Sequence, residues 1–328
     1  MIIKTVTKSL DLLAHEALAR RLPNNHPEKP KIEQKILSMR SGYRGEKSLV
    51  YPLRNLTDKY LIFFGLRLPD GEYHFQIDSF LLSTKVIHLV EVKNHSEEIY
   101  LPDNFNQMIQ TYKHTARRYP DPRLQILSHE ELITNFLTQN KLACPPINKI
   151  IVFTNPNVIV KGSLQALKMV CPPEELTARI DAFEERFRTD FFQPRDLKKI
   201  SRKLLKAHSP HSPDVLNLFK IPPVHLINGV RCPACLSYAM CRGHGWWECR
   251  FCGCKSKNAH LETVIDYFLI VKPCITNQEF RKLVGISCPK LATNLLARLK
   301  LPFIGDKKGR TYYPPHDFEI WAQQESEF

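Results

Sequence analysis

The chain has 328 residues, of which 43% are hydrophobic, so it is long enough for two or three domains with a sizeable core. Its 47 Lys and Arg residues outnumber its 33 Asp and Glu residues, and the net charge of +14 favours nucleic acid or another polyanion as a partner. No apolar run approaches the ~18 residues of a membrane span, and the N-terminal segment carries Asp11 and Glu16, which a signal peptide would lack. We therefore expect a cytoplasmic protein that does not bind membranes. The sequence leaves open whether it forms a homodimer.

Composition and hydrophobic spacing divide the chain into six segments. We expect a helical N-terminal extension, an α/β domain, a basic helix with a linker, a cysteine-rich module, a second folded domain and a short tail. Their bounds are 1–40, 41–190, 191–228, 229–257, 258–316 and 317–328. The elements predicted inside the α/β domain are strands near 60–66 and 149–154, a hairpin over 74–93, and helices over 104–118 and 129–140.

The predicted hairpin over 74–93 is the most informative segment of the chain. Its second arm, 86–93, is almost continuously apolar, as a central strand buried on both faces is. Thr84 and Lys85 are the expected two-residue turn between the arms. This turn fixes which residues of the two arms lie opposite each other.

Two acidic residues face each other in this register. Asp78 on the first arm lies opposite Glu91 on the second, with Cβ atoms roughly 4.5–5.5 Å apart. Facing carboxylates repel, and one of them protonates unless a cation lies between them. Lys93 lies on the same face of the strand as Glu91. The set predicts a divalent metal site, and the alternative is a solvated strand end with an acid near the turn.

Two Cys-x-x-Cys pairs form a second signal. Their spacing suits tetrahedral Zn²⁺ held by four thiolates, in a reducing compartment. The four cysteines are Cys232, Cys235, Cys249 and Cys252. Spare ligands that could replace one of them are Cys241, His244 and Cys254. The module is similar to a zinc ribbon, and four protein ligands leave no open position, so we expect a structural metal. A nucleic-acid or protein contact surface and a small fold stapled by metal are both open.

The segment 258–313 is predicted to contain three helices followed by a β-ribbon. This order is similar to a winged helix-turn-helix, with 287–299 as the recognition helix and 302–313 as the wing. The candidate DNA contacts are Lys290, Thr293, Asn294 and Arg298 on the helix and Lys307, Lys308 and Arg310 on the wing. Because many winged helices bind protein, a protein partner is the alternative.

Five short sequences between residues 42 and 155 carry a family resemblance. They are Gly45-Glu46, Gln76-Ile77-Asp78, Glu91-Val92-Lys93-Asn94, Asn104-Phe105-Asn106-Gln107 and Val152-Phe153-Thr154-Asn155. In this order they resemble the nuclease-related domain family, NERD, of the restriction-endonuclease-like PD-(D/E)xK superfamily. The resemblance implies an α/β fold with a mixed β-sheet core flanked by helices.

The resemblance also assigns roles to the acidic pair and its neighbours. Asp78, Glu91 and the backbone carbonyl of Val92 would bind Mg²⁺ or Mn²⁺. Lys93 would orient the attacking water or stabilise charge on the scissile phosphate.

Two further residues receive roles by resemblance. Glu46 would support the metal from beyond its direct ligands or bind a second metal. Gln107 would position the substrate or a metal-bound water from a helix. RecB-like nucleases carry Gln-x-x-x-Tyr on this helix, and neither Gln107 nor Gln110 is followed by Tyr at that spacing.

We therefore expect a metal-dependent nuclease that hydrolyses DNA phosphodiester bonds, with zinc and winged-helix modules that bind nucleic acid. Endonuclease and exonuclease action are both open. The alternatives are a catalytically inactive DNA-binding or regulatory protein that uses the nuclease fold as a scaffold, and a nuclease directed at RNA.

Overall fold

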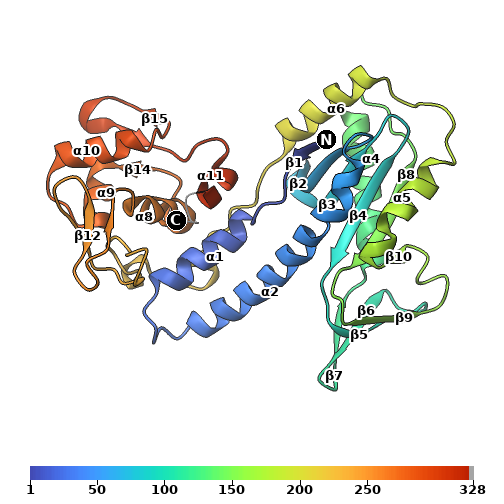
Figure 1. Cartoon of the computed structure of the whole chain (residues 1–328), viewed down its shortest axis with the longest axis horizontal. Coiled ribbons are helices and arrows are strands. Elements are labelled where there is room, and N and C mark those ends of the chain that lie inside the picture. Colours follow the sequence, from blue (N-terminus) through green and yellow to red (C-terminus); the bar gives the residue numbers. More distant parts are fainter. Residues whose placement is uncertain (325–328) are drawn as a thin grey trace. The chain divides into compact units, whose positions relative to one another are not determined.

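The structure is a computed structural model that describes residues 1–324, so the end of the expected tail, 325–328, and the side chain of Lys308 lie outside it. The chain is mixed α/β, as predicted, and the residues described form four β-sheets. They separate into two compact units (Figure 1). Unit 1 comprises Met1–Thr7 and Arg40–Ser209, and unit 2 comprises Lys8–Met39 and the chain from Pro210 onward. One boundary falls within helix α2 (Lys29–Ser48).

Unit 1 is built on a six-stranded mixed sheet in the order β1-β2-β3-β4-β8-β10. The strands are β1 (Ile2–Lys4), β2 (Leu61–Asp70), β3 (Tyr73–Leu82), β4 (Ile87–Lys93), β8 (Ile147–Phe153) and β10 (Val170–Cys171). β2, β3 and β4 are antiparallel neighbours, whereas β4 and β8 are parallel and are connected through helix α4 (Pro122–Gln139). Every residue of β4 before Lys93 is buried, as its apolar run predicts for a central strand.

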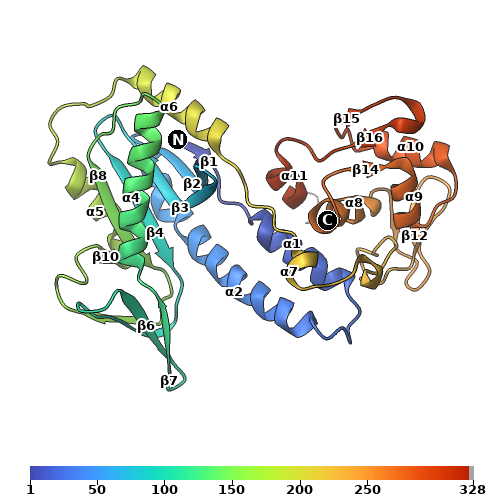
Figure 2. The same ribbon diagram turned by 180° about the vertical axis from the view of Figure 1, so that it is seen from behind.

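Helices cover both faces of this sheet. The other helices of unit 1 are α3 (Val50–Leu53), α5 (Leu176–Glu184) and α6 (Pro194–Ala207), with short 3₁₀ turns at Arg54–Leu56 and Pro173–Glu175. α4 and α6 share a core with Leu89 on one face, and α3 and α5 share a core with Val90 on the other (Figure 2). Successive residues of a strand point to opposite faces, so Glu91 and Lys93 lie on the face that α4 covers.

The helix predicted over 104–118 is wrong. This segment belongs to a second sheet in the order β7-β6-β5-β9. Its strands are β5 (Glu97–Leu101), β6 (Gln107–Tyr112), β7 (Thr115–Pro120) and β9 (Val158–Gly162). Buried Met108 and Gln110 alternate with half-buried Ile109 and Thr111, which is the period of a strand.

The helix predicted over 129–140 is present, but it begins earlier, at Pro122. The side chain of Asp121 accepts a hydrogen bond from the backbone N–H of Arg123 and caps the helix. Pro122 occupies the first helical position, where its missing N–H is not needed. α4 therefore adds two turns to the predicted helix, and these turns carry Gln125.

Unit 2 holds the cysteine-rich module and the C-terminal helices. Its helices are α1 (Leu10–Arg21), α7 (Val215–Leu218), α8 (His260–Ile270), α9 (Asn277–Val284), α10 (Pro289–Arg298) and α11 (Phe318–Gln324), with 3₁₀ turns at Pro223–His225 and Lys307–Gly309. One small sheet consists of β11 (Met240–Arg242), β12 (Trp247–Cys249) and β13 (Lys255–Ser256), and the other of β14 (Ile275–Thr276), β16 (Thr311–Tyr312) and β15 (Phe303–Ile304). The three helices and the ribbon follow each other in the predicted order, and the winged-helix resemblance stays a prediction.

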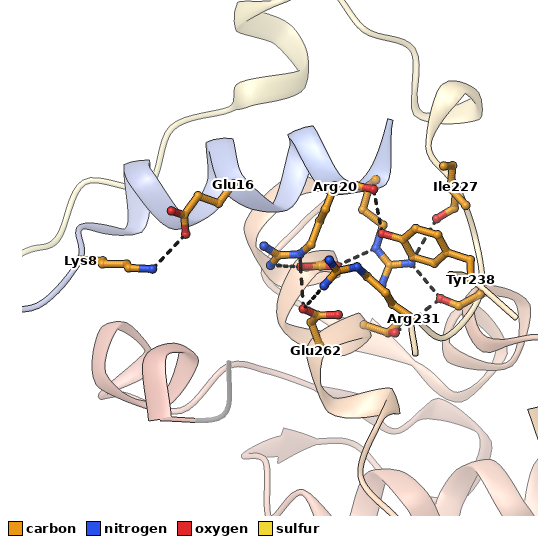
Figure 3. A network of polar contacts seen from close by, with 11 residues as sticks. Lys8, Glu16, Arg20, Ile227, Arg231, Tyr238 and Glu262 are labelled. Atoms are coloured by element: carbon orange, nitrogen blue, oxygen red, sulfur yellow. Dashed lines mark hydrogen bonds and ion pairs between the residues drawn. The ribbon is translucent and has the colours of Figure 1, made fainter. Parts of the chain in front are cut away.

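Helix α1 is attached to the rest of unit 2 by paired charges (Figure 3). The buried guanidinium of Arg21 donates to Asp266 on α8 at 2.6 Å, and Arg20 binds the same carboxylate. Arg231 donates to Glu262 at 3.1 Å, and the hydroxyl of Tyr238 donates to the backbone carbonyl of Arg20 at 2.9 Å. Because buried charges are tolerated only when they are paired, removing one partner of this network would destabilise the unit strongly.

Candidate functional site

The β3–β4 hairpin has the register that the sequence predicts. Leu82 lies opposite Ile87 and Ser79 opposite Val90. The N–H of Ser83 donates to the carbonyl of Val86 at 3.0 Å and closes the turn. Continuing this register by one residue places Asp78 opposite Glu91, where the regular ladder has ended.

The carboxylate of Asp78 takes the place of the next ladder bond. Its Oδ2 accepts a hydrogen bond from the backbone N–H of Val92 at 2.8 Å. In a β-strand the N–H and C=O of one residue point the same way, so the carbonyl of Val92 also faces β3. The structure therefore puts two oxygen donors, the Asp78 carboxylate and the Val92 carbonyl, on one side of β4.

Glu91 is a buried carboxylate with one oxygen left unsatisfied. Only 2% of its side chain is exposed, and its Oε1 accepts a hydrogen bond from Lys93 Nζ at 2.6 Å. Its Oε2 lies 3.7 Å from Nδ1 of His129 and has no hydrogen-bond partner within residues 1–324. A buried oxygen with free lone pairs beside a second carboxylate fits the oxygen-rich coordination of Mg²⁺ or Mn²⁺.

Burial and mutual repulsion make this pair hard to ionise without a cation. Burial, followed by the charge of Asp78, raises the pKa of Glu91 to about 8. Burial also raises the pKa of Asp78, while the N–H of Val92 and the charge of Lys93 oppose the shift. One of the two carboxyl groups therefore keeps a proton near neutral pH unless a divalent cation replaces it.

Two residues of α4 that the sequence interpretation missed complete the surroundings. Lys93 Nζ donates to Oε1 of Gln125 at 2.9 Å, so its ammonium lies between Gln125 and Glu91. Burial, and then the charge of Lys93, lowers the pKa of His129 to about 4, so its ring is neutral. Gln125 and His129 lie four residues apart, on one side of α4. This Gln-x-x-x-His spacing, together with the cap at Asp121 and Pro122, is the signal that could have revealed them.

The other two residues implied by resemblance lie on other elements than the acidic pair, and the role of Glu46 stays a prediction. Glu46 lies in α2, and among the described residues it does not form a three-ligand cluster with Asp78 and Glu91. Gln107 begins strand β6 rather than a helix and pairs with Pro120. The helix-borne role expected of Gln107 therefore has no structural basis.

The domain that contains the acidic pair has a recognised family. Residues 41–154 match the family model of the nuclease-related domain. The matched segment runs from α2 through β8 and contains Asp78, Glu91, Lys93, Gln125 and His129. The match indicates a nuclease-related function for unit 1, and the resemblance noted in the sequence is confirmed. Neither a curated protein nor a solved structure matches the chain significantly.

Outside the nuclease-related domain, the structure gathers the four predicted cysteines. The Sγ atoms of the Cys232, Cys235, Cys249 and Cys252 side chains all lie within 4.8 Å of one another. No other described His, Cys, Asp or Glu belongs to this group, so none of the spare ligands is needed. Backbone N–H donation, led by Cys252, lowers the pKa of Cys249 to about 6, which favours its thiolate, whereas burial raises the pKa of Cys232 to about 12. The cluster is compatible with Zn²⁺ in a zinc ribbon.

The predicted nucleic-acid contacts of unit 2 separate into two places. Lys290, Lys307 and Arg310 line one hollow of about 670 Å³, together with Asp306. Arg298 lines another, of about 390 Å³. Asn294 is exposed on α10 and lines neither hollow, and the side chain of Lys308 lies outside the described part of the chain.

None of the helices within residues 1–324 is long and apolar enough to cross a bilayer.

Proposed function

We propose that the nuclease-related domain hydrolyses DNA phosphodiester bonds with Mg²⁺ or Mn²⁺ bound at Asp78 and Glu91. The observation that carries the proposal is the buried carboxylate pair, with one partnerless oxygen and a single cation, Lys93, beside it, inside the segment that matches the family. Most buried polar atoms are hydrogen-bonded, so the partnerless Oε2 of Glu91, beside a second carboxylate, calls for an explanation. A cation between the two carboxylates would coordinate the free oxygen and would offset the burial and repulsion that raise the pKa of Glu91.

Each residue of the site would have a distinct role in the proposed hydrolysis. Asp78, Glu91 and the carbonyl of Val92 would hold the ion, whose charge activates a bound water and neutralises the phosphate. The ammonium of Lys93, fixed by Glu91 and Gln125, would stabilise negative charge that develops on the phosphate. Gln125 acts through Lys93 and is a positioning residue. Neutral His129 lies beside the oxygen of Glu91 and would keep that side of the site free of a second positive charge.

Unit 2 would supply structure and binding rather than catalysis. Zn²⁺ at the four cysteines would have no open coordination position, so it would stabilise the small β11-β12-β13 sheet. Lys290, Lys307 and Arg310 would contact nucleic-acid phosphates from their shared hollow. DNA is the proposed partner, and RNA is the alternative. We also propose a cytoplasmic location, because a reducing compartment keeps cysteines free of disulfides.

The test is cleavage of supercoiled plasmid and of end-labelled single- and double-stranded DNA, with Mg²⁺, Mn²⁺ or EDTA. We expect metal-dependent products from the natural chain and none from Asp78→Ala or Glu91→Ala, with DNA binding retained in both variants. Product lengths distinguish endonuclease from exonuclease action. DNA binding without cleavage in every metal would favour the inactive scaffold, and cleavage confined to matched RNA substrates would favour the RNA-directed enzyme.

A further inference from the structure

The hairpin β6–β7, which His95 contacts two residues after Lys93, carries a concentration of positive charge. Its residues 107–120 include Lys113, His114, Arg117 and Arg118 and no acidic residue. All four side chains are exposed, and neither arginine has an acidic partner within the described part of the chain. The nearest acid along the ladder, Glu97, accepts the backbone N–H of Lys113 rather than its ammonium. We call residues 112–118 the basic arm.

The turn of the basic arm uses residues that a turn of this type disfavours. Tyr112 pairs with Thr115, so Lys113 and His114 form a two-residue turn, with φ angles of 48° and 62°. Turns with positive φ at both positions favour Asn and Gly, because other side chains crowd the backbone there. Lys113 and His114 make the turn less stable than Asn and Gly would at these positions. Such strained positions are typical of segments whose side chains have a functional role.

One face of the hairpin continues from the end of β4. Cross-strand partners share a face, and Gln110 lies opposite Arg117. Nδ1 of His95 lies 3.1 Å from Oε1 of Gln110, and the His95 ring packs on Tyr119 with centroids 4.8 Å apart. His95 follows Lys93 by two residues. Arg117 therefore lies on the same face of the hairpin as Gln110 and Tyr119, which His95 contacts. It is two residues from Tyr119 along β7, toward the turn.

We propose that the basic arm binds the phosphate backbone of DNA beside the bond that is cut. Arginine binds phosphate through paired N–H donors. Arg117 and Arg118 point to opposite faces of β7, so with Lys113 at the turn they offer cations at several places along a polyanion rather than one site for a small anion. The exposed ring of Tyr112, with Lys113 Nζ 5.5 Å from its centre, offers a surface on which an unpaired base can stack. The inference rests on the proposed function for the identity of the polyanion and for the position of the cut, whereas the contact between the arm and DNA is tested independently of cleavage.

The rival explanation is protection of a sheet edge. β7 is an edge strand, and cations on such strands prevent pairing with other chains. That role would account for Arg117 and Arg118 on β7, but it requires neither Lys113 nor His114 in a disfavoured turn. The two explanations differ in whether DNA touches the arm.

The first experiment places a photo-crosslinking phenylalanine analogue at position 112 in the zinc-loaded full chain, with a labelled DNA duplex or single strand, and omits Mg²⁺ and Mn²⁺ to prevent cleavage. The control places the analogue at Tyr73, which is 77% exposed at the far end of β3. We expect a cross-link to DNA from position 112 and none from position 73, with the yield falling as salt rises. Equal yields from both positions, or none from position 112, would overturn the proposal.

The second experiment removes the charges. Arg117→Ala combined with Arg118→Ala should reduce the cross-link from position 112 and lower the salt slope of duplex binding by about 0.9 for each phosphate that the arm no longer neutralises. The matched control, Arg186→Ala with Arg188→Ala, removes two exposed arginines near the end of α5 and should change neither quantity. An unchanged cross-link and slope in the arm variant would support edge protection instead. A cross-link without cleavage under any metal would refute the proposed catalysis and leave the arm as a DNA contact.

Discussion

Gln125 shows how one neutral side chain can fix the position of a charge in the proposed site. Lys93 has two oxygen partners, Glu91 and Gln125, and a metal ion would compete with Lys93 for Glu91. Once Glu91 binds the ion, Gln125 would be the partner that keeps the ammonium near the phosphate. Sequence reasoning located Asp78, Glu91 and Lys93 because the hairpin register is a local property. It missed Gln125 because the hydrogen bond to Lys93 joins residues 32 apart through the packing of α4.

Replacing Gln125 with alanine should therefore slow cleavage without preventing metal binding. Loss of one hydrogen bond to a charged group corresponds to a rate about tenfold lower. Single-turnover cleavage at saturating Mn²⁺ measures the effect, and Gln139→Ala, an exposed change near the end of the same helix, is the control. A Gln125→Ala rate equal to that of the natural chain would show that Lys93 is positioned by other means.

At the scale of elements, helix α2 approaches the end of β4 at a glycine. A Cβ added to Gly45 would lie 2.9 Å from both Asn94 Cβ and Thr154 Oγ1. The amide of Asn94 donates to the carbonyl of Ser41 on the same helix at 2.8 Å. The close approach and this hydrogen bond hold α2 against the strand end that carries Glu91 and Lys93.

Two alanine substitutions in α2 should have opposite effects on stability. Gly45→Ala should lower the free energy of unfolding by about 1–3 kcal/mol, because the methyl group overlaps neighbouring atoms. Gly42→Ala has nothing within 4 Å of the added Cβ and should raise the free energy by up to about 1 kcal/mol, since alanine favours a helix. Urea unfolding of both variants measures the difference. Effects of the same sign would contradict the packing described for Gly45.

His88, on β4, should make the stability of unit 1 sensitive to acid. Its Nε2 lies 3.2 Å from the hydroxyl of Tyr60 and its Nδ1 3.1 Å from the amide of Asn148, and one neutral ring satisfies both bonds. Burial lowers the pKa of His88 from 6.5 to about 3, with Glu184 opposing and Lys59 assisting the shift. As the pH falls below 6.5, His88 therefore becomes protonated in the unfolded chain but stays neutral in the folded chain, which favours unfolding.

The contribution of His88 to the free energy of unfolding should accordingly fall by on the order of 1–2 kcal/mol between about pH 6.5 and about pH 5. His88→Gln should be less stable than the natural chain at neutral pH and should lose less stability over this interval. The control is His74→Gln, which changes an exposed histidine of β3. Urea unfolding at several pH values tests this, and parallel pH profiles for His88→Gln and the natural chain would contradict it.

The predicted helix over 104–118 failed for a physical reason. The segment is a hairpin whose turn residues are Lys113 and His114. Both have positive φ, a conformation in which Asn or Gly is usual, so the sequence carries no turn signal there. The strand period of Met108 and Gln110 is visible only once their partners on β5 and β7 are known. The cysteine cluster could be predicted because metal-ligand spacing is local in sequence. The start of α4 was predicted seven residues too late, because the helix begins at a cap, Asp121, in the polar segment before its apolar residues.

At the scale of the whole molecule, each unit has its own hydrophobic core. All three tryptophans follow residue 210, so tryptophan fluorescence reports on unit 2. Trp247 and the ligand Cys249 belong to the same short strand and to the same core. Loss of a structural metal should therefore disturb the surroundings of Trp247.

Zinc chelation should destabilise unit 2 and leave unit 1 folded. We expect the unfolding transition followed by tryptophan fluorescence to move to lower denaturant, corresponding to several kcal/mol. Circular dichroism reports both units, and the part of its change that tryptophan fluorescence does not follow, which belongs to unit 1, should stay in place. Cys235→Ser should reproduce the effect, and Cys288→Ser, which changes an exposed cysteine outside the cluster, should not. Transitions that move together would show that the two units unfold as one.

The proposed chemistry depends above all on a divalent ion held by Asp78 and Glu91 in the nuclease-related domain. Calorimetric titration of the zinc-loaded chain with Mn²⁺ detects such an ion directly, with Glu91→Gln as the variant. The control is Glu72→Gln, which changes an exposed residue between β2 and β3. We expect Mn²⁺ to bind the natural chain and the control, with protons released as Glu91 ionises, and not to bind Glu91→Gln. Equal Mn²⁺ binding by the natural chain and Glu91→Gln would contradict a metal site at this pair.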